Sequence, residues 1–456
     1  MKGVVVMRKL VVLTLVLFLC LIPATSIAAK NSIAINVSLN TPVTDSILAD
    51  LNKHGKVLTV LEDINCLTMK VYASELANIQ GLSYVSAANP DAIRKSAPIN
   101  TVAATNFTNG LSTWDLDAVN VTDFGANGRT VEYDGTGVYV AVLDTGLVDN
   151  WRQYFPEQRI AEEYAISFGG GGGERGAVSS QPNKWEHDQD SHGTHVTSSI
   201  LGYSLSGVAI NGTAPNVTVI PVKVLNQNGS GWSSVVAMGI DYVAELKLHQ
   251  LADVPVIINM SLGGPALDAM EKAAIDKAVE AGVIIVASAG NEGTAGMGYP
   301  GAYEPVISVA ASGWRGEWTS SSWWLLDVPD PTSADDFYIA DFSGRQLPGQ
   351  DLDVAAPGSW IVGPYQVNNG HISYYFLGGT SMASPHVAGI VALMAQKNPT
   401  LIAAEAESIL EAAAVPMPAG SCTILNGNGA SETVSWDADA TGSGLVDAAA
   451  ALALVP

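Results

Sequence analysis

The chain has 456 residues, 48% of them hydrophobic, and its formal net charge at pH 7 is −23. This apolar content is enough for a large core, which excludes a disordered or low-complexity protein. The acidic balance disfavours nucleic acid and anionic membranes as partners, because both are negatively charged. The only cysteines are Cys20, Cys66 and Cys422. They form no disulfide framework, so an exported form of the chain must be stabilised mainly by its core.

Residues 1–28 have the order of a secretory signal peptide. Three basic residues precede the apolar run 10–22, and small residues follow it up to Ala28 and Ala29. The run is shorter than the roughly 18 residues that a membrane span needs, although a retained anchor is the alternative. We expect cleavage near Ala28 or Ala29, secretion of the remainder, and no membrane contact afterwards. Loss of the three basic residues would leave a net charge of about −26.

Residues 30–95 are predicted to form a small separate domain. From residue 31 to 90, "SIAINV", "DSILADLNK", "KVLTVL", "CLTMKV", "ASELANI" and "SYVSA" alternate as strand, helix, strand, strand, helix and strand. This order is the split βαβ pattern of a ferredoxin-like α+β fold. From residue 91 the periodicity stops, and Asn, Thr, Ala and Gly accumulate. Residues 96–112 are therefore predicted to be an exposed linker that contains a processing site.

Residues 113–456 are predicted to form an α/β domain. Short apolar runs bounded by turns are typical of buried strands, and they occupy residues 138–143, 217–225, 256–260, 283–287 and 306–311. Helical periodicity occupies residues 234–248, 266–281 and 381–396. The alternation indicates a mostly parallel sheet with helices on both faces, whose site lies at the carboxyl ends of the strands. The glycine run 169–173 follows no convincing strand and is predicted to be a flexible connection.

Three motifs carry residue types that together support nucleophilic catalysis. "VAVLDTG" contains Asp144, "DSHGTHV" contains His192, and "GGTSMASPHVAG" contains Ser381. A hydroxyl nucleophile needs a base to take its proton, and the base needs a carboxylate to hold its tautomer. Singly, these residues have structural explanations as a turn cap, a helix start and a helix cap. Jointly they indicate an Asp-His-Ser triad.

With these motifs in this order, the sequence resembles the subtilisin-like serine proteases over nearly its whole length. The resemblance implies that Ser381 attacks the scissile carbonyl, that His192 acts as base and then acid, and that Asp144 orients it. In "ASAGNEG", Asn291 matches the family's oxyanion-hole side chain, although an αL turn residue is the alternative. Residues 30–95 resemble the family's pro-domain, an intramolecular inhibitor.

The resemblance also implies a set of substrate-binding residues. Two strands would hold an extended peptide between them by β-augmentation, which reads the backbone and implies broad specificity. Trp232 matches a wall of an outer apolar pocket, with a buried core position as the alternative. Gly298 matches the floor of the pocket for the residue before the cut, where a glycine leaves room for large apolar side chains. The two strands are Gly229, Ser230 and Gly231 on one side and Ser261, Leu262 and Gly263 on the other.

Other polar residues in these motifs are interpreted as structural. His195 lies three residues after His192, which suggests a metal pair, but no third ligand lies nearby and the family uses only the first histidine. Ser384 and His386 are interpreted as packing or hydrogen-bonding residues. The loop "GYSLSGVAING" offers few of the oxygen ligands with which family members bind calcium there, so a tight calcium site at this loop is not expected.

Residues 313–339 are longer than the matching segment of simple family members, and they contain four tryptophans and an acidic stretch. Such an insertion packs on the body, contacts substrate or meets a partner, because a solvated loop does not expose four tryptophans. Its aspartates carry oxygen ligands of the kind that calcium prefers, but their spacing is irregular, and a solvated acidic loop is the alternative. They are Asp327, Asp330, Asp335 and Asp336.

The sequence thus predicts a secreted, monomeric serine endopeptidase that acts on proteins or peptides, prefers large apolar residues before the cut, and activates itself by cleaving off residues 30–95. Its chemistry requires no cofactor, structural calcium is left open, and no metal ligands are assigned. A sedolisin-like acid protease is one alternative, but "HGTHV" and Asn291 argue against its glutamate base. A catalytically silent binding protein on the same fold is the other.

Overall fold

The computed structural model describes residues 31–104, 112–123, 128–172, 176–205, 207–367 and 370–456. The predicted signal peptide, residues 1–28, lies outside these ranges. Within them, no helix is both long enough and apolar enough to cross a membrane.

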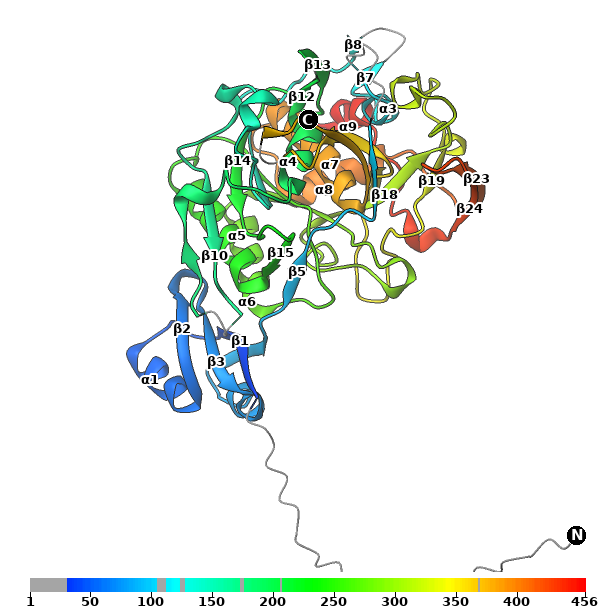
Figure 1. Ribbon diagram of the computed structural model, residues 1–456. Helices are drawn as coiled ribbons and strands as arrows, with labels where there is room; N and C mark the ends of the chain where they lie inside the picture. The colour runs from blue at the N-terminus through cyan, green and yellow to red at the C-terminus, as the bar shows by residue number, and fades with distance from the viewer. Residues whose placement is uncertain (1–30, 105–111, 124–127, 173–175, 206, 368–369) are drawn as a thin grey trace, which may run out of the picture. The chain divides into compact units, whose positions relative to one another are not determined.

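Residues 32–90 form an antiparallel sheet of four strands with two helices (Figure 1). The strand order is β2-β3-β1-β4. Thr44 caps the first helix by accepting a hydrogen bond from the Ile47 amide (3.3 Å). Alternate strand residues such as Ile35, Val37 and Met69 fill a separate core under the helices. The elements are β1 Ser32–Leu39, α1 Asp45–His54, β2 Gly55–Leu61, β3 Cys66–Tyr72, α2 Leu76–Gln80 and β4 Val85–Pro90.

A nine-stranded, mostly parallel sheet forms the centre of the remaining chain. Its strands follow the order β11-β10-β14-β9-β16-β17-β18-β19, with β20 also beside β18. Only β11 and β19 pair antiparallel with their neighbours. These strands are β9 Tyr139–Asp144, β10 Ile166–Gly169, β11 Ser179–Ser180, β14 Thr218–Lys223, β16 Val256–Met260, β17 Val283–Ser288, β18 Ile307–Trp314, β19 Phe337–Ile339 and β20 Val354–Pro357.

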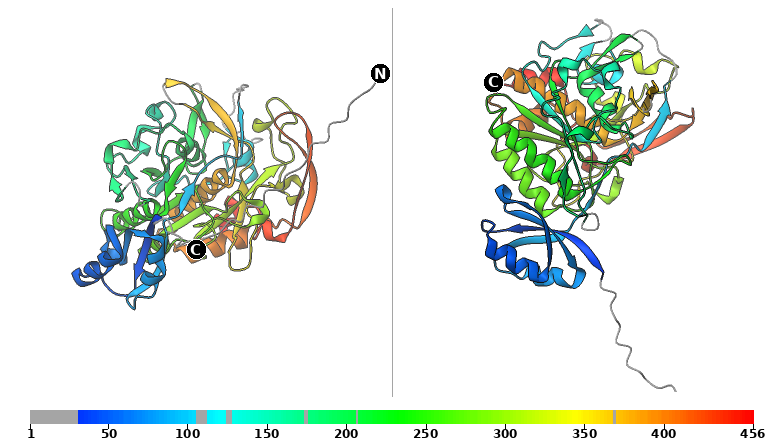
Figure 2. Two further views of the ribbon diagram at one scale, coloured as in Figure 1. Left: turned by 60° about the horizontal axis from the view of Figure 1, so that its bottom comes forward. Right: turned by 60° about the vertical axis from the view of Figure 1, so that its left-hand side comes forward.

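Helices cover both faces of this sheet, which confirms the predicted α/β class (Figure 2). Alternate residues of β9 show the two faces. Val140 and Val142 belong to the core under α4 and α7, and Ala141 and Leu143 belong to the core under α5 and α6. Strands buried on both faces are apolar throughout, which explains the continuous hydrophobic runs of the sequence. The helices are α4 His192–Leu201, α5 Ser233–Leu248, α6 Ala269–Glu280 and α7 Thr380–Lys397.

Shorter elements surround the sheet. They include the antiparallel pairs β12 with β13 and β23 with β24, and two strands that matter for the site, β15, which pairs with β5, and β22, which lies between β21 and β6. Their bounds are α3 Trp114–Ala118, β7 Thr122–Asp123, β8 Gly128–Arg129, β12 Gly202–Leu205, β13 Val208–Asn211, β15 Ser230–Trp232, β21 Ile361–Pro364, β22 Tyr374–Gly378, α8 Ala403–Ala413, β23 Gly420–Leu425, β24 Ser431–Trp436 and α9 Ala448–Leu454.

The segment after β4 contains two short strands that were not predicted from the sequence. Residues Ile93–Lys95 form strand β5 against β15, and Asn100–Ala103 form strand β6 against β22. Arg94 is fully buried. Of these residues only Asn100–Ala103 lie within the predicted linker 96–112, where they form a strand in place of irregular chain. Both strands form by pairing with distant parts of the chain and need no hydrophobic period of their own. Residues 105–111 of the predicted linker lie outside the described ranges.

The glycine run follows strand β10, contrary to the expectation that no strand precedes it. Gly169 ends β10, and the Gly172 amide donates a hydrogen bond to Asp91 Oδ2 (2.9 Å). Gly172 has a φ of +70°, and a Cβ atom there would lie 2.4 Å from the Trp232 ring. The glycine therefore meets a conformational and a steric requirement.

Candidate active site

Asp144 and His192 form a buried pair at the carboxyl end of the sheet. Asp144 is the last residue of β9, and His192 is the first residue of α4. His192 Nδ1 lies 2.9 Å from Asp144 Oδ1 and 3.0 Å from Oδ2. Burial alone lowers the pKa of His192, but the Asp144 carboxylate outweighs it and raises that pKa above its ordinary value of 6.5. The pair fixes the proton on Nδ1 and leaves Nε2 available as a base.

A second carboxylate, that of Asp188, is hydrogen-bonded to the residue after Asp144. Thr145 Oγ1 donates a hydrogen bond to Asp188 Oδ2 (2.9 Å), and Thr145 Oγ1 also accepts one from the Gly193 amide (2.8 Å). The loop after β9 is thereby tied to the first turn of α4. Burial raises the pKa of Asp188 to about 7. Neither Asp188 nor Thr145 was identified from the sequence, since a turn threonine and an acidic loop residue carry no distinctive signal.

Ser381 lies in the first turn of α7 and is buried. Its Oγ donates a hydrogen bond to the Ser261 carbonyl (3.2 Å). His192 Nε2 is buried and has no hydrogen-bond partner among the residues that the structure describes. Ser261 Oγ in turn donates to the Ser381 carbonyl (2.8 Å) and lies 2.8 Å from Ser384 Oγ. The start of α7 is thus tied to the residues that follow β16, and its dipole favours negative charge beside Ser381.

Asn291 is oriented by the same helix. Its Oδ1 accepts hydrogen bonds from the Thr380 amide and the Thr380 hydroxyl, both at 2.9 Å. With Oδ1 occupied, Nδ2 is directed to the start of α7, 3.7 Å from the position of a Cβ atom on Gly379. Nδ2 is therefore a fixed donor beside the residue that precedes Thr380 and Ser381. The role of Thr380 in orienting Asn291 could not be found from the sequence, because the two residues are 89 positions apart.

The two predicted substrate strands flank an extended segment, which is the chain's own β5. Ser230 pairs with Lys95, Gly231 with Arg94, and Trp232 with Ile93. On the other side, Lys95 and Gly263 exchange two backbone hydrogen bonds of 3.0 Å each. An extended chain therefore lies between β15 and Gly263, as β-augmentation requires.

The same segment continues toward α7. The Ser96 amide donates to the Gly229 carbonyl (2.9 Å), and the Ile99 amide donates to the Gly378 carbonyl (2.7 Å). Gly378 ends β22 and lies three residues before Ser381. Ala97 and Pro98 therefore cross from one half of the site to the other, and β6 continues along β22 (Figure 1).

The remaining predicted substrate residues contribute in different ways. Leu262 is 1% exposed, so it offers backbone and no side-chain surface. Trp232 is half-buried and lines a hollow of about 220 Å³ together with Ile93 and Gly172. Gly298 is buried, and a Cβ atom on it would meet Gly264 and Gly290 at 3.6 to 3.7 Å. The wall around Gly298 is thus built from glycine backbone.

The other two histidines of the motifs have structural surroundings. His195 Nε2 lies 3.1 Å from the Ile361 carbonyl, and burial lowers the pKa of His195 to about 3. A neutral ring bonded to a backbone carbonyl supports packing in the core. His386 Nδ1 lies 2.8 Å from the Met382 carbonyl, and its Nε2 lies 2.8 Å from Asp115 Oδ2.

Two groups of carboxylates bring their oxygen atoms within 4.8 Å of one another. Oxygen atoms at such separations are the ligands that calcium takes. Of the four aspartates predicted in the insertion, only Asp327 belongs to a group among the described residues. Burial raises the pKa of Asp117 and of Asp353 to about 7. The groups are Asp117, Asp123 and Asp327, and Asp351, Asp353 and Glu407.

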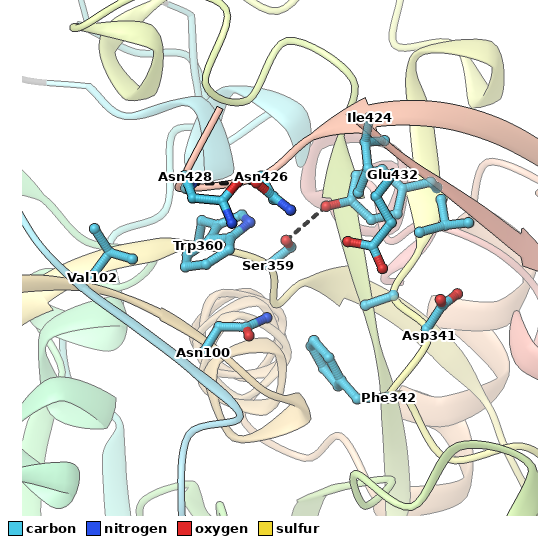
Figure 3. A pocket seen from close by; sticks show the side chains of 14 residues that line it. Asn100, Val102, Asp341, Phe342, Ser359, Trp360, Ile424, Asn426, Asn428 and Glu432 are labelled. Atoms are coloured by element: carbon cyan, nitrogen blue, oxygen red, sulfur yellow. Dashed lines mark hydrogen bonds between the residues drawn. The ribbon is translucent and has the colours of Figure 1, made fainter. Parts of the chain in front are cut away.

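The insertion 313–339 packs on the body of the molecule. Trp314, Trp323 and Trp324 are buried in the main core, and Trp323 and Trp324 contact Phe376 of β22. Of the three predicted alternatives, the structure supports packing. A hollow of about 370 Å³ lies nearby, lined by β6, the β23–β24 hairpin and Trp360 (Figure 3). Its lining contains none of Asp144, His192 and Ser381.

A buried carboxylate–imidazole pair at the end of a parallel strand, and a serine at the N-terminus of a helix packed on the same sheet, are the residue types that a serine hydrolase uses. The family model of the subtilase family matches residues 135–441, and the chain belongs to this family, which is one of serine endopeptidases. The chain is 34% identical over 266 residues to the thermostable alkaline protease of Halalkalibacterium halodurans, which covers 58% of this chain and 59% of that protein. It is 34% identical over 286 residues to subtilisin DY of Bacillus licheniformis, covering 62% and 85%.

Among solved structures, fervidolysin from Fervidobacterium pennivorans, a keratinolytic enzyme related to subtilisin, matches with a TM-score of 0.65 and 26% identity. That match covers 94% of this chain and 62% of fervidolysin. The chain therefore spans about three fifths of the length of fervidolysin and of the alkaline protease.

Proposed function

We propose that this chain is a secreted serine endopeptidase with Asp144, His192 and Ser381 as its catalytic triad. The observation that carries the proposal is the buried pair of hydrogen bonds between His192 Nδ1 and the Asp144 carboxylate, at 2.9 and 3.0 Å. It holds the imidazole in the tautomer whose Nε2 can accept a proton. That Nε2 has no protein partner among the described residues.

In the proposed reaction, Ser381 Oγ leaves the Ser261 carbonyl, transfers its proton to His192 Nε2 and attacks the scissile carbonyl carbon. Asn291 Nδ2 and the Ser381 amide donate hydrogen bonds to the oxyanion that forms. His192 then gives the proton to the leaving amine, and an acyl-enzyme remains. Water, deprotonated by His192, hydrolyses the ester and restores Ser381. Asp144 stays ionised and stabilises the imidazolium. No cofactor takes part in these steps.

Substrates of this enzyme would be proteins or peptides bound as extended strands between residues 229–231 and 261–263. Backbone pairing supplies most of the contact, so specificity would be broad. The glycine wall around Gly298 supports a preference for a large apolar side chain before the cut. The carboxylate groups at Asp117 and Asp353 are the places where structural calcium would bind.

Residues 30–95 would act as an intramolecular inhibitor that the enzyme removes by cleaving itself. The support is the course of residues 93–99, which fill the position of a substrate between β15 and Gly263 and then pass to Gly378. A second peptide cannot pair with those edges while this segment is present. Removal of residues 30–95 would free them and give a monomeric, secreted mature enzyme.

The experiment compares Ser381→Ala with Ser421→Ala, a change at an exposed serine, in the purified full chain. We expect Ser381→Ala to abolish peptide hydrolysis, separation of residues 30–95 and labelling by a fluorophosphonate probe. Ser421→Ala should keep all three. Unchanged separation in Ser381→Ala would disprove self-cleavage. Failure of the unchanged protein to react with the probe would disprove an activated Ser381.

A further inference from the structure

Arg94 is a fully buried cation in the segment that crosses the cleft. Its side chain and that of Glu271 are both 0% exposed. Arg94 Nη2 lies 2.5 Å from Glu271 Oε2, and Nε lies 3.1 and 3.2 Å from the two carboxylate oxygens. Nη2 also donates to the Ala266 carbonyl (2.9 Å). The guanidinium thus meets both oxygens of one carboxylate and a backbone acceptor, the geometry in which arginine differs most from lysine.

The backbone register places Arg94 relative to Ser381. Arg94 pairs with Gly231, Lys95 exchanges two bonds with Gly263, and Ser96 donates to Gly229. The next backbone bond after Ser96 runs from Ile99 to Gly378, so three peptide bonds lie between the two halves of the site, and the middle one joins Ala97 to Pro98. Counted back from that bond, Arg94 is the fourth residue on its amino side.

We propose that Glu271 makes the peptide cleft select a cationic side chain, arginine above all, at the fourth residue before the scissile bond. The inference rests on the proposed endopeptidase function and names its substrate class more narrowly. Glu271 belongs to α6, so it stays in the enzyme when the segment that carries Arg94 leaves. Arg94 is then the chain's own example of the side chain that the cleft accepts.

The surroundings of Glu271 favour a planar cation over an apolar side chain. Asp268, the N-cap of α6, is a second negative charge that acts on Arg94. An apolar side chain would bury the Glu271 carboxylate without a partner, which is more costly than leaving it in water. Burial raises the pKa of Glu271, and the Arg94 guanidinium opposes that rise. A Cβ atom on Gly264 would lie 2.6 Å from Arg94 Nη1, so the guanidinium fits closely against a backbone without a side chain.

The first test uses the purified protein obtained from the full chain and four peptides, Xaa-Lys-Ser-Ala joined to a fluorogenic amine, with Xaa as Arg, Lys, Leu or Glu. We expect kcat/KM for Arg to exceed that for Leu at least tenfold, with Lys between them and Glu lowest. Equal or faster cleavage of the Leu peptide would overturn the proposal.

The second test changes the carboxylate. Glu271→Gln should bring the Arg-to-Leu ratio to within threefold of one, and Glu280→Gln, at an exposed position of the same helix, should leave it unchanged. An unchanged ratio in Glu271→Gln would overturn the proposal. Because Glu271→Gln leaves Arg94 poorly paired, the double variant Arg94→Leu/Glu271→Leu keeps the pocket filled during folding. It should prefer Leu to Arg, and a retained preference for Arg would also overturn the proposal.

A third measurement separates this proposal from the proposed function. In the Ser381→Ala full chain, the amides of Lys95 and Ser96 are bonded to Gly263 and Gly229. Their hydrogen exchange should be at least tenfold faster when Glu271→Gln is added. Lack of peptide cleavage and of probe labelling would refute the proposed function, and unchanged exchange would then overturn the cation pocket as well. Peptide cleavage without a preference for Arg would overturn the pocket alone.

Discussion

Two parts of this molecule are attached to the same α/β body by opposite means. Residues 32–104 meet it through hydrogen bonds and ion pairs, and through apolar contacts of Ile64 and Cys66 with one core and of Ala104 with the other. The insertion 313–339 meets it through tryptophans buried in the main core. Water can replace a hydrogen bond when a segment leaves, but it cannot replace apolar burial. The means of attachment therefore agrees with a releasable segment in the first case and a permanent one in the second.

Besides the backbone pairing of β5 and β6, side chains of this segment form hydrogen bonds at the N-termini of two neighbouring helices. Asp91 Oδ1 accepts hydrogen bonds from Ser233 Oγ and the Ser234 amide, both at 3.0 Å, at the start of α5. At the start of α6, Asn36 and Asn89 donate to Asp268, at 2.8 and 2.6 Å. Helix N-termini carry free amides and a positive dipole end, which attract carboxylates. The α/β body thus offers its own helix ends as the contact surface.

The largest expected effect is the loss of stability when a buried tryptophan of the insertion is removed. In the inactive Ser381→Ala chain, Trp324→Ala removes a side chain that is 0% exposed and should lower the free energy of unfolding by about 3–5 kcal/mol. Urea unfolding followed by circular dichroism measures it. Leu326→Ala, at a residue of the same insertion that is 37% exposed, should cost less than about 1 kcal/mol. Equal costs for the two variants would contradict burial as the attachment of the insertion.

A smaller effect is expected when a carboxylate that attaches residues 32–104 to the α/β body is removed. Asp91→Ala in the Ser381→Ala chain leaves the Ser234 amide and the Gly172 amide without their buried acceptor. The local opening of residues 93–99 should become easier by about 2–3 kcal/mol. Amide hydrogen exchange at Lys95 measures this opening, and Asp149→Ala, at an exposed residue, is the control. If exchange at Lys95 stayed the same, Asp91 would not hold the segment.

The sequence predicts the central sheet and its helices well, because strands buried on both faces and amphipathic helices leave a local pattern. The runs 256–260 and 283–287 lie within β16 and β17 almost residue for residue. Asp144, His192, Ser381 and Asn291 carry distinctive motifs. The structure pairs His192 with Asp144 and ties Asn291 to Thr380, the residue before Ser381, while the triad itself stays a prediction.

The parts that the sequence did not predict depend on partners far along the chain. β5 and β6 have no hydrophobic period, since their backbone pairs with β15 and β22. Arg94 and Glu271 are 177 residues apart, and a single arginine or glutamate is indistinguishable from a solvated surface residue. Segments stabilised by pairing and charge rather than by their own burial pattern are the ones that local sequence analysis misses.

The smallest expected effect concerns how the stability of the insertion depends on pH. Glu317, inside the insertion, is 1% exposed, and burial raises its pKa from 4.5 to about 8. The folded chain therefore retains a proton that the unfolded chain loses above pH 4.5, so this group's stabilising contribution is greatest below pH 4.5 and is lost as the pH rises to 8. Between these two pH values, the contribution of this group makes the free energy of unfolding fall by at most about 1.4 kcal/mol per pH unit.

Glu317→Gln in the Ser381→Ala chain should remove this part of the pH dependence, because the amide does not titrate. Its Oε1 can accept from the Trp314 amide, and its Nε2 can donate to the Tyr338 hydroxyl oxygen, as the O–H of a protonated carboxyl would. Unfolding free energies measured at pH 5, 6, 7 and 8 give the slope for each chain. Glu432→Gln, at an exposed residue of β24, is the matched control and should keep the original slope. If Glu317→Gln had the same slope as this control, the buried carboxyl would not contribute to the pH dependence. A smaller slope in Glu317→Gln alone would show that the insertion is destabilised as the pH rises because one buried carboxyl must lose its proton.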